Sequence, residues 1–142
     1  MATAAADGAN LVTRLLDATN AHDLERLVDC FTEGYVNHTP AHPARGFTGR
    51  DQVRRNWARI FASVPDLAAR VLATAPAADG IWTEWEMSGR RPDGTDHLMR
   101  GVIIFEIDTQ EHRARAARFF LEPVDHEQLD ADTAVREILA GP

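Results

Sequence analysis

The chain has 142 residues, of which 44% are hydrophobic and 26% are charged, and this size and composition predict one globular domain with a sizeable core. Acidic residues outnumber basic ones by 22 to 15, and the formal net charge of −7 argues against nucleic acid or an anionic membrane as the main partner. All 15 basic residues are arginine, and the absence of lysine excludes Schiff-base chemistry, pyridoxal attachment and a P-loop.

The single cysteine and the first residues of the chain bear on its compartment. Cys30 has no partner for an intrachain disulfide and belongs to no cysteine-rich zinc motif, which favours a reducing, cytoplasmic compartment. Residues 1–9 have neither the basic start nor the apolar run of a signal peptide, and we expect them to be disordered. No segment reaches the roughly 18 consecutive apolar residues of a membrane span. We therefore expect one domain over residues 10–142 and no membrane segment.

Helices are predicted in the first half of the chain. Apolar residues recur every three to four positions over residues 10–20, which indicates an amphipathic helix. A second helix is predicted over residues 23–31, with an acid in its first turn and an apolar stripe along one side. Thr48 and Asp51 form a box-like N-cap arrangement that predicts the start of a third helix, which ends at Pro65.

Strands dominate the second half of the chain. A short strand over residues 34–39 precedes the third helix. Four β-like segments follow it, separated by turn-forming sequences, over residues 67–75, 81–89, 97–107 and 113–122. A short helix over residues 130–140 closes the chain. This order predicts an α+β fold in which helices cover a cone-shaped, curved antiparallel sheet that encloses a pocket. No Gly-rich fingerprint supports a Rossmann-type nucleotide site.

Charged residues fall in phase along three of the predicted strands. Because successive side chains of a strand alternate between its faces, residues two apart share a surface if neighbouring strands align. The set includes Glu84, Glu86, Arg100, Glu106, Arg118 and Glu122, and it is interleaved with Trp82, Ile104 and Phe120. This surface is either a solvated outer sheet face with cross-strand ion pairs or the lining of a cavity, in which a carboxylate acts as a general acid or base.

Four residues are candidates for catalytic work on the second interpretation. Glu122, at the end of the last strand, is the best single candidate for a general base. Arg100 is its electrostatic partner, which keeps the carboxylate ionised or fixes a substrate oxyanion, and Glu84 is a second carboxylate. His38, which follows Asn37 on the first short strand, is a proton relay or a hydrogen-bonded residue of a turn.

Further residues are candidates for binding a substrate. His97 is in phase with apolar residues and is either a satisfied core histidine or an acid-base group. Trp57 and Trp85 are candidate walls of the cavity or plain core residues, and Arg118 is a candidate substrate ligand. The six histidines show no HxH or HExxH spacing, so no metal site is expected.

Several stretches resemble the SnoaL-like branch of the nuclear transport factor two-like superfamily. They are EWEMSG from residue 84, DGTDHLMRGVIIFEI from residue 93 and RFFLEPV from residue 118, preceded by LLDATNAHDLERLVDCFTEGYVNH from residue 15. The resemblance covers about residues 10–124. It implies a cone of helices around a curved antiparallel sheet, a homodimer, and a deep apolar cavity of the kind used by polyketide cyclases, ketosteroid isomerases, dehydratases and epoxide hydrolases.

This resemblance implies a cofactor-independent enzyme of the cyclase, isomerase or dehydratase type. Such an enzyme removes a proton next to a carbonyl of an apolar polyketide- or steroid-like substrate. Glu122 matches the acidic residue that often closes the last strand, although Asp is frequent there. The Arg-x-Asp pair of limonene-type epoxide hydrolases is broken, because Gly101 and Val102 follow Arg100. The only tyrosine, Tyr35, is not on the first helix, where the isomerase pattern needs one.

A different class of function remains open at this point. The same cavity, or the outer sheet face, serves equally well in a non-catalytic binding module for a hydrophobic small ligand or a protein partner.

Overall fold

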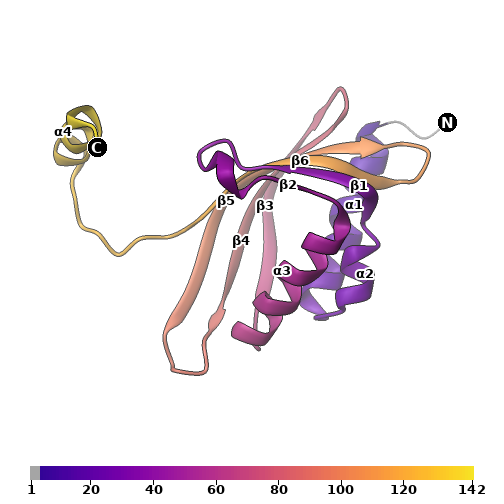
Figure 1. Ribbon diagram of the computed structural model, residues 1–142, viewed down its shortest axis with the longest axis horizontal. Helices are drawn as coiled ribbons and strands as arrows, with labels where there is room; N and C mark the ends of the chain where they lie inside the picture. The colour runs from indigo at the N-terminus through magenta and orange to yellow at the C-terminus, as the bar shows by residue number, and fades with distance from the viewer. Residues whose placement is uncertain (1–3) are drawn as a thin grey trace.

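The computed structural model describes residues 4–142 and has an α+β architecture (Figure 1). In chain order its elements are α1 (Ala4–Asn20), α2 (Leu24–Val28), β1 (Phe31–His38), the 3₁₀ helix η1 (Pro43–Arg45), β2 (Phe47–Thr48), α3 (Arg50–Ser63), β3 (Ala68–Ala77), β4 (Gly80–Arg90), β5 (Asp96–Asp108), β6 (Arg113–Pro123) and α4 (Ala131–Ala140). The predicted order of helices followed by a meander of strands is confirmed.

Within the described part of the chain, the strands form one six-stranded sheet in the order β2-β1-β6-β5-β4-β3. The neighbours from β3 to β6 pair antiparallel through hairpins, as does β1 with β2. The pair β1–β6 is parallel, so the curved sheet is mixed rather than wholly antiparallel. No tight turn joins these two strands, so hairpin geometry does not fix their relative direction.

The first helix begins earlier than the sequence predicted. It starts at Ala4, so the expected disorder of residues 1–9 is wrong for residues 4–9, while residues 1–3 lie outside the described residues. Asp7 is buried, and its carboxylate lies 2.8 Å from Nδ1 of His112. Gly8 packs so closely on Ile81 that a Cβ at Gly8 would lie 2.9 Å from that side chain. Docking against the sheet therefore orders this end of the chain.

Two other helix boundaries differ from the prediction. The second helix, α2, ends at Val28, and Phe31 begins β1 instead of completing a helical stripe. The N-cap of α3 is Gly49, with a φ of +98°, because Thr48 is engaged in β2 opposite Val36. The predicted capping arrangement of Thr48 is therefore wrong, and a positive φ favours glycine at the following position.

The core lies between the helices and one face of the sheet. Helix α1 packs against β3, β4 and β5, whereas α3 packs against α2 and β1. Large buried side chains of this core include Trp85, Phe105 and Leu11. Cys30 is buried among them, as expected of a small core residue. None of the helices between residues 4 and 142 combines the length and apolar character that a membrane span requires.

Candidate functional site

The two faces of the sheet have different surroundings. On β4, Ile81, Thr83 and Trp85 are buried beneath the helices, whereas the alternate residues Trp82 and Glu84 are exposed. We call the helix-covered side the inner face and the other side the outer face. The alternation predicted from the sequence is confirmed, because the strands align with Glu86 opposite Arg100 opposite Glu122, and with Trp82 opposite Ile104 opposite Arg118.

A row of charges crosses the outer face. Nε of Arg70 and Nε of Arg100 each donate a hydrogen bond of 2.8 Å to the carboxylate of Glu86. These two bonds, from Arg70 first and Arg100 second, hold the pKa of Glu86 below its ordinary range. Arg100 therefore has Glu86 as its partner, and the predicted pairing of Arg100 with Glu122 is not formed.

Glu122 has a partner that the sequence did not reveal. Its Oε1 lies 2.9 Å from Nε2 of His42, and both side chains are about two-fifths exposed, at 42% and 39%. His42 lies in the loop between β1 and η1, where no periodic pattern gives its direction. The predicted general base is thus a partly solvated member of the outer face.

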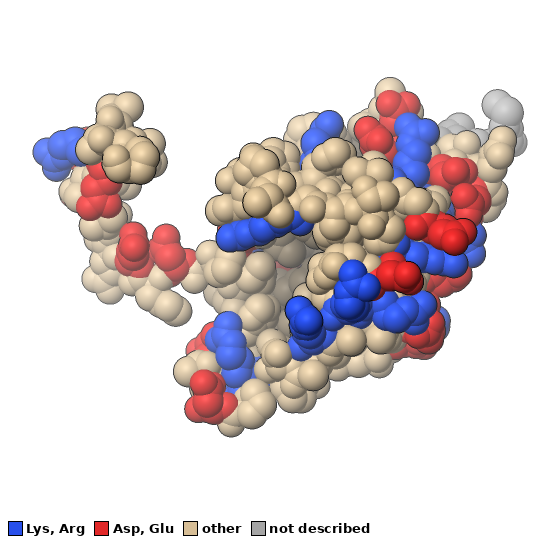
Figure 2. All heavy atoms as spheres, viewed as in Figure 1, with Lys and Arg blue, Asp and Glu red and all other residues tan. Residues whose placement is uncertain are grey.

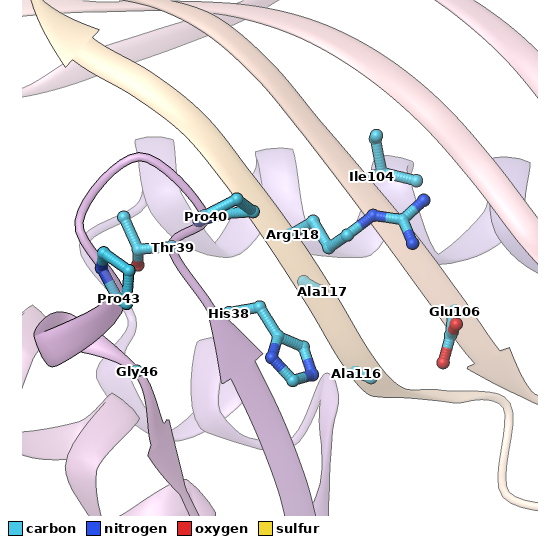
Figure 3. A pocket seen from close by; sticks show the side chains of 10 residues that line it. All are labelled: His38, Thr39, Pro40, Pro43, Gly46, Ile104, Glu106, Ala116, Ala117 and Arg118. Carbon is cyan, nitrogen blue, oxygen red and sulfur yellow. The ribbon is translucent and has the colours of Figure 1, made fainter.

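A cavity of about 440 Å³ opens on the outer face beneath the loop that follows β1 (Figure 3). His38 and Arg118, which are register partners across β1 and β6, line it together with Glu106. Its apolar walls come from Ile104, Pro40 and Pro43. Among residues 4–142, neither the imidazole of His38 nor the guanidinium of Arg118 has an ion pair or a hydrogen bond. Two of the predicted site residues therefore meet here.

The inner face has a hollow beside α3, visible in Figure 2. Half-buried apolar side chains of α3 and of the sheet pack against the edge of the core, namely Trp57, Ile60, Phe61, Met99, Phe119 and Leu121. The rings of Trp57 and Phe61 pack with centroids 5.6 Å apart. The role of Trp57 as a cavity wall stays a prediction.

His97 is a half-buried histidine on the same side of β5 as Met99. Nη2 of Arg91 lies 3.3 Å from Nδ1 of His97. Because a guanidinium only donates, Nδ1 accepts and the neutral ring carries its proton on Nε2. Burial, and secondly the charge of Arg91, lower the pKa of His97 below 6.5. His97 is therefore a neutral hydrogen-bond donor at neutral pH.

Asp66 brings a carboxylate to the same region. Gly89 pairs with His97 across β4 and β5, and a Cβ at Gly89 would lie 2.8 Å from Oδ1 of Asp66. The same oxygen accepts a hydrogen bond of 2.7 Å from the backbone of Arg90. Asp66 lies in the loop after Pro65, where no periodic pattern marks it, although its place directly beyond the end of α3 was a usable signal.

The interior also contains polar residues that are already paired. Nε1 of Trp85 donates to Oγ1 of Thr83 over 2.6 Å, and Trp85 is fully buried, so its predicted role as a cavity wall is wrong. The hydroxyl of Tyr35 donates to Oδ1 of Asn37 over 2.8 Å, and burial raises the pKa of Tyr35. Asn37 is buried while the following His38 is exposed, so the two do not act together.

The eight predicted site residues therefore do not form one site. Strand alternation places most of them on the outer face, where no helix covers them, and these are Glu122, Arg100, Glu84, His38 and Arg118. His97 and Trp57 are half-buried, and Trp85 belongs to the core. Within the part of the chain that the structure describes, no group of three or more His, Cys, Asp or Glu side chains is arranged to hold a metal ion.

Three helices packed against one face of a curved sheet form the fold of nuclear transport factor two-like proteins. The family model of the SnoaL-like domain matches residues 12–131. The chain belongs to this SnoaL-like family, as the resemblance of its strand sequences implied.

Solved structures share this fold at low sequence identity. A protein of unknown function with a cystatin-like fold from Methylobium petroleophilum has a TM-score of 0.69 and 20% identity, covering 96% of this chain and 93% of that one. A SnoaL-like protein of unknown function from Burkholderia thailandensis has a TM-score of 0.64 and 22% identity, covering 84% and 97%. A Mycobacterium tuberculosis protein in complex with estradiol-17beta-hemisuccinate has a TM-score of 0.68 and 15% identity, covering 89% and 96%. No curated protein matches the chain.

Proposed function

We propose that the protein binds an apolar small molecule with a carbonyl group in the hollow beside α3. The observation that carries this proposal is the neutral imidazole of His97 on the same face as a wall of half-buried apolar side chains that includes Trp57 and Met99. Apolar walls with a few fixed polar groups are the usual composition of small-molecule sites. The walls bury the hydrocarbon part of the ligand, and Nε2–H of His97 donates to its carbonyl oxygen.

The reaction we propose is proton abstraction next to that carbonyl, without a cofactor. We assign to Asp66 the role that was predicted for Glu122, because its Oδ1 lies beside Gly89, the register partner of His97. The carboxylate of Asp66 accepts the proton from the α carbon. The electron pair of that C–H bond forms the carbon–carbon double bond of the enolate, and the π electron pair of the carbonyl group moves to its oxygen. His97 stabilises the resulting enolate by its hydrogen bond. Reprotonation at another carbon completes an isomerisation, and attack on a second carbonyl completes a cyclisation.

Binding is tested by titrating the protein with steroid ketones and polycyclic ketones and following intrinsic fluorescence and thermal stability. The choice of probes follows from the steroid bound by the Mycobacterium tuberculosis protein of the same fold. A ligand that binds only the folded state raises its melting temperature. Trp57→Ala is expected to weaken binding at least tenfold. Trp82→Ala, the matched change on the outer face, is expected to leave affinity within twofold, and the opposite result would exclude the hollow as the site.

The role of each polar residue has its own readout. His97→Phe is expected to weaken binding of a ketone but not of the corresponding hydrocarbon. Asp66→Asn is expected to abolish exchange of the α protons with deuterated water while leaving affinity unchanged. If the wild-type protein binds ketones tightly but exchanges no α proton, the hypothesis of an enzyme is rejected. The protein is then a non-catalytic module that binds its ligand in the same hollow.

A further inference from the structure

The exposed large apolar side chains of residues 4–142 fall in only two places. Three belong to the sheet, namely Leu72, Trp82 and Phe120. Four belong to the segment after β6, which we call the C-terminal arm (residues 124–142), namely Leu129, Val135, Ile138 and Leu139. The other large apolar side chains of the described residues are at least partly buried. Two separate exposed apolar patches therefore indicate surfaces that are covered when the protein binds a partner.

The C-terminal arm carries a helix that its sequence specifies well. Asp130 caps α4 by accepting from the backbone of Thr133 over 2.9 Å, and Gly141 ends the helix with a φ of +73°. Val135, Ile138 and Leu139 share one side of α4, because they are three and four residues apart. Ile138 and Leu139 are 76% and 80% exposed. A helix of ten residues is marginal in water unless such a face is packed.

The outer face offers a matching surface. Trp82 and Phe120 are 48% and 41% exposed, and Val102 and Ile104 of β5 lie between them in register. The cavity of about 440 Å³ opens beside this strip. Among the described residues, its Arg118 guanidinium and its His38 imidazole have no hydrogen bond or ion pair. The arm contains five acidic residues and one arginine, so it can supply a carboxylate to the guanidinium of Arg118.

The arm does not cover the outer face of its own chain. Figure 1 shows α4 standing clear of the body at the end of an extended segment. The last backbone tie of this segment to the sheet is the hydrogen bond from Val124 to Leu98. Residues 124–130 span up to about 24 Å when extended, which exceeds the roughly 10 Å between β6 and β4. Its own sheet is thus within reach, and the arm extends away from it.

We propose that α4 of one copy packs on the outer face of a second copy, and that the two copies exchange arms reciprocally. Val135, Ile138 and Leu139 cover Trp82 and Phe120 of the other copy, and acidic groups of the arm lie near its Arg118. This assignment rests on the exposed apolar side of α4, on the exposed Trp82 and Phe120, and on the course of the arm away from its own sheet (Figure 1). The arrangement is closed by a two-fold axis, so it produces a dimer and not a filament.

Engineered cysteines test the exchange in the full-length chain, because the only native cysteine, Cys30, is buried. One preparation carries Ile138→Cys and the other carries Trp82→Cys, and the two are mixed and oxidised. Neither chain can form this disulfide by itself, so a cross-linked dimer on a non-reducing gel is expected only if the arm reaches the other copy. Glu137→Cys, on the opposite side of α4, replaces Ile138→Cys as the matched control and is expected to cross-link at least tenfold less.

Sedimentation velocity separates the exchange from dimerisation itself. Ile138→Asn is expected to raise the dimer dissociation constant at least tenfold, and Glu137→Asn to change it less than threefold. A dimer that is unchanged by Ile138→Asn would overturn the arm exchange while leaving the homodimer intact. A wild-type protein that is monomeric at all concentrations would overturn both. A third chain carries both Ile138→Cys and Trp82→Cys. If this chain forms an internal disulfide while the mixture of single variants forms no cross-link, the arm docks on its own sheet and the exchange is overturned.

Discussion

Trp85 and Thr83 form a hydrogen bond at the centre of the core, where Nε1 of the indole donates to Oγ1 of the hydroxyl over 2.6 Å. The same Oγ1 donates to the backbone carbonyl of Ile103 over 2.6 Å, so Thr83 links β4 to β5. Both side chains are buried, so the indole N–H needs an acceptor within the protein. The pair explains how a tryptophan and a threonine share an apolar interior without an unsatisfied donor.

We predict that Thr83→Val destabilises the fold by about 1–3 kcal/mol, because the shape is kept while the buried indole N–H loses its acceptor. Urea unfolding followed by circular dichroism measures the change. Thr13→Val is the control, since the hydroxyl of Thr13 is exposed and bonds only the carbonyl of Ala9. Equal midpoints for the two variants would show that the bond to Trp85 contributes nothing.

Gly101 is predicted to tolerate no side chain. Its φ is +151°, and a Cβ would lie 2.0 Å from the carbonyl oxygen of Phe120 on the neighbouring strand. Gly101→Ala must therefore push β6 away from β5, and we expect a loss of more than about 3 kcal/mol or failure to fold. Gly34→Ala is the control, because nothing lies within 4 Å of its added Cβ and its φ is not positive. It is expected to change the unfolding midpoint little, and a similar loss in both variants would contradict the steric argument.

The sequence predicted the fold better than the site, and strand alternation explains both results. The period of two along β4, β5 and β6 correctly grouped Glu86, Arg100 and Glu122, since alternation depends only on local geometry. Which of the two groups faces the helices depends on packing between distant elements. The interleaved Trp82 and Phe120 made the charged face resemble a cavity lining, whereas the structure leaves both exposed.

The sequence patterns did not predict the contacts that loop residues make. His42 and Asp66 lie outside any periodic segment, yet one pairs with Glu122 and the other fills the space at Gly89. The extended course of the C-terminal arm was equally hidden, because the pattern of Val135, Ile138 and Leu139 predicts a helix with an apolar face but not what covers that face.

The thiol of Cys30 is predicted to be almost inert in the folded protein. Burial raises its pKa to about 11, so at pH 8 about one thiol in a thousand is ionised, compared with about one in ten at the ordinary value of 9.0. Reaction with a disulfide reagent at pH 8 is therefore expected to be at least a hundredfold slower than in urea. A native rate close to the unfolded rate would show that Cys30 is accessible, and it would remove the basis for single-cysteine labelling of the arm.

His97 is predicted to titrate below the ordinary histidine value of 6.5, because burial and the charge of Arg91 both disfavour its protonated form. The unfolded chain then binds this proton more readily than the folded one, so the contribution of His97 to stability is lost as pH falls from about 6.5 towards its folded pKa. Nuclear magnetic resonance titration of the imidazole, assigned with His97→Gln, measures the pKa directly. Ketone binding is expected to remain constant above pH 6.5, where Nε2–H is present on a neutral ring.

Substitution of Arg91 separates the two causes that lower the pKa of His97, namely burial and the charge of Arg91. Arg91→Gln removes the charge but not the burial, and burial is the larger cause, so the pKa of His97 is expected to rise only part of the way towards 6.5. Arg90→Gln is the control, because the side chain of Arg90 lies 3.5 Å from Asp96 and does not contact His97. A complete return to 6.5 in Arg91→Gln would mean that burial contributes nothing and that His97 faces water. In that case the imidazole could not polarise a carbonyl group in a desolvated site, and the proposed binding mode would fail with it.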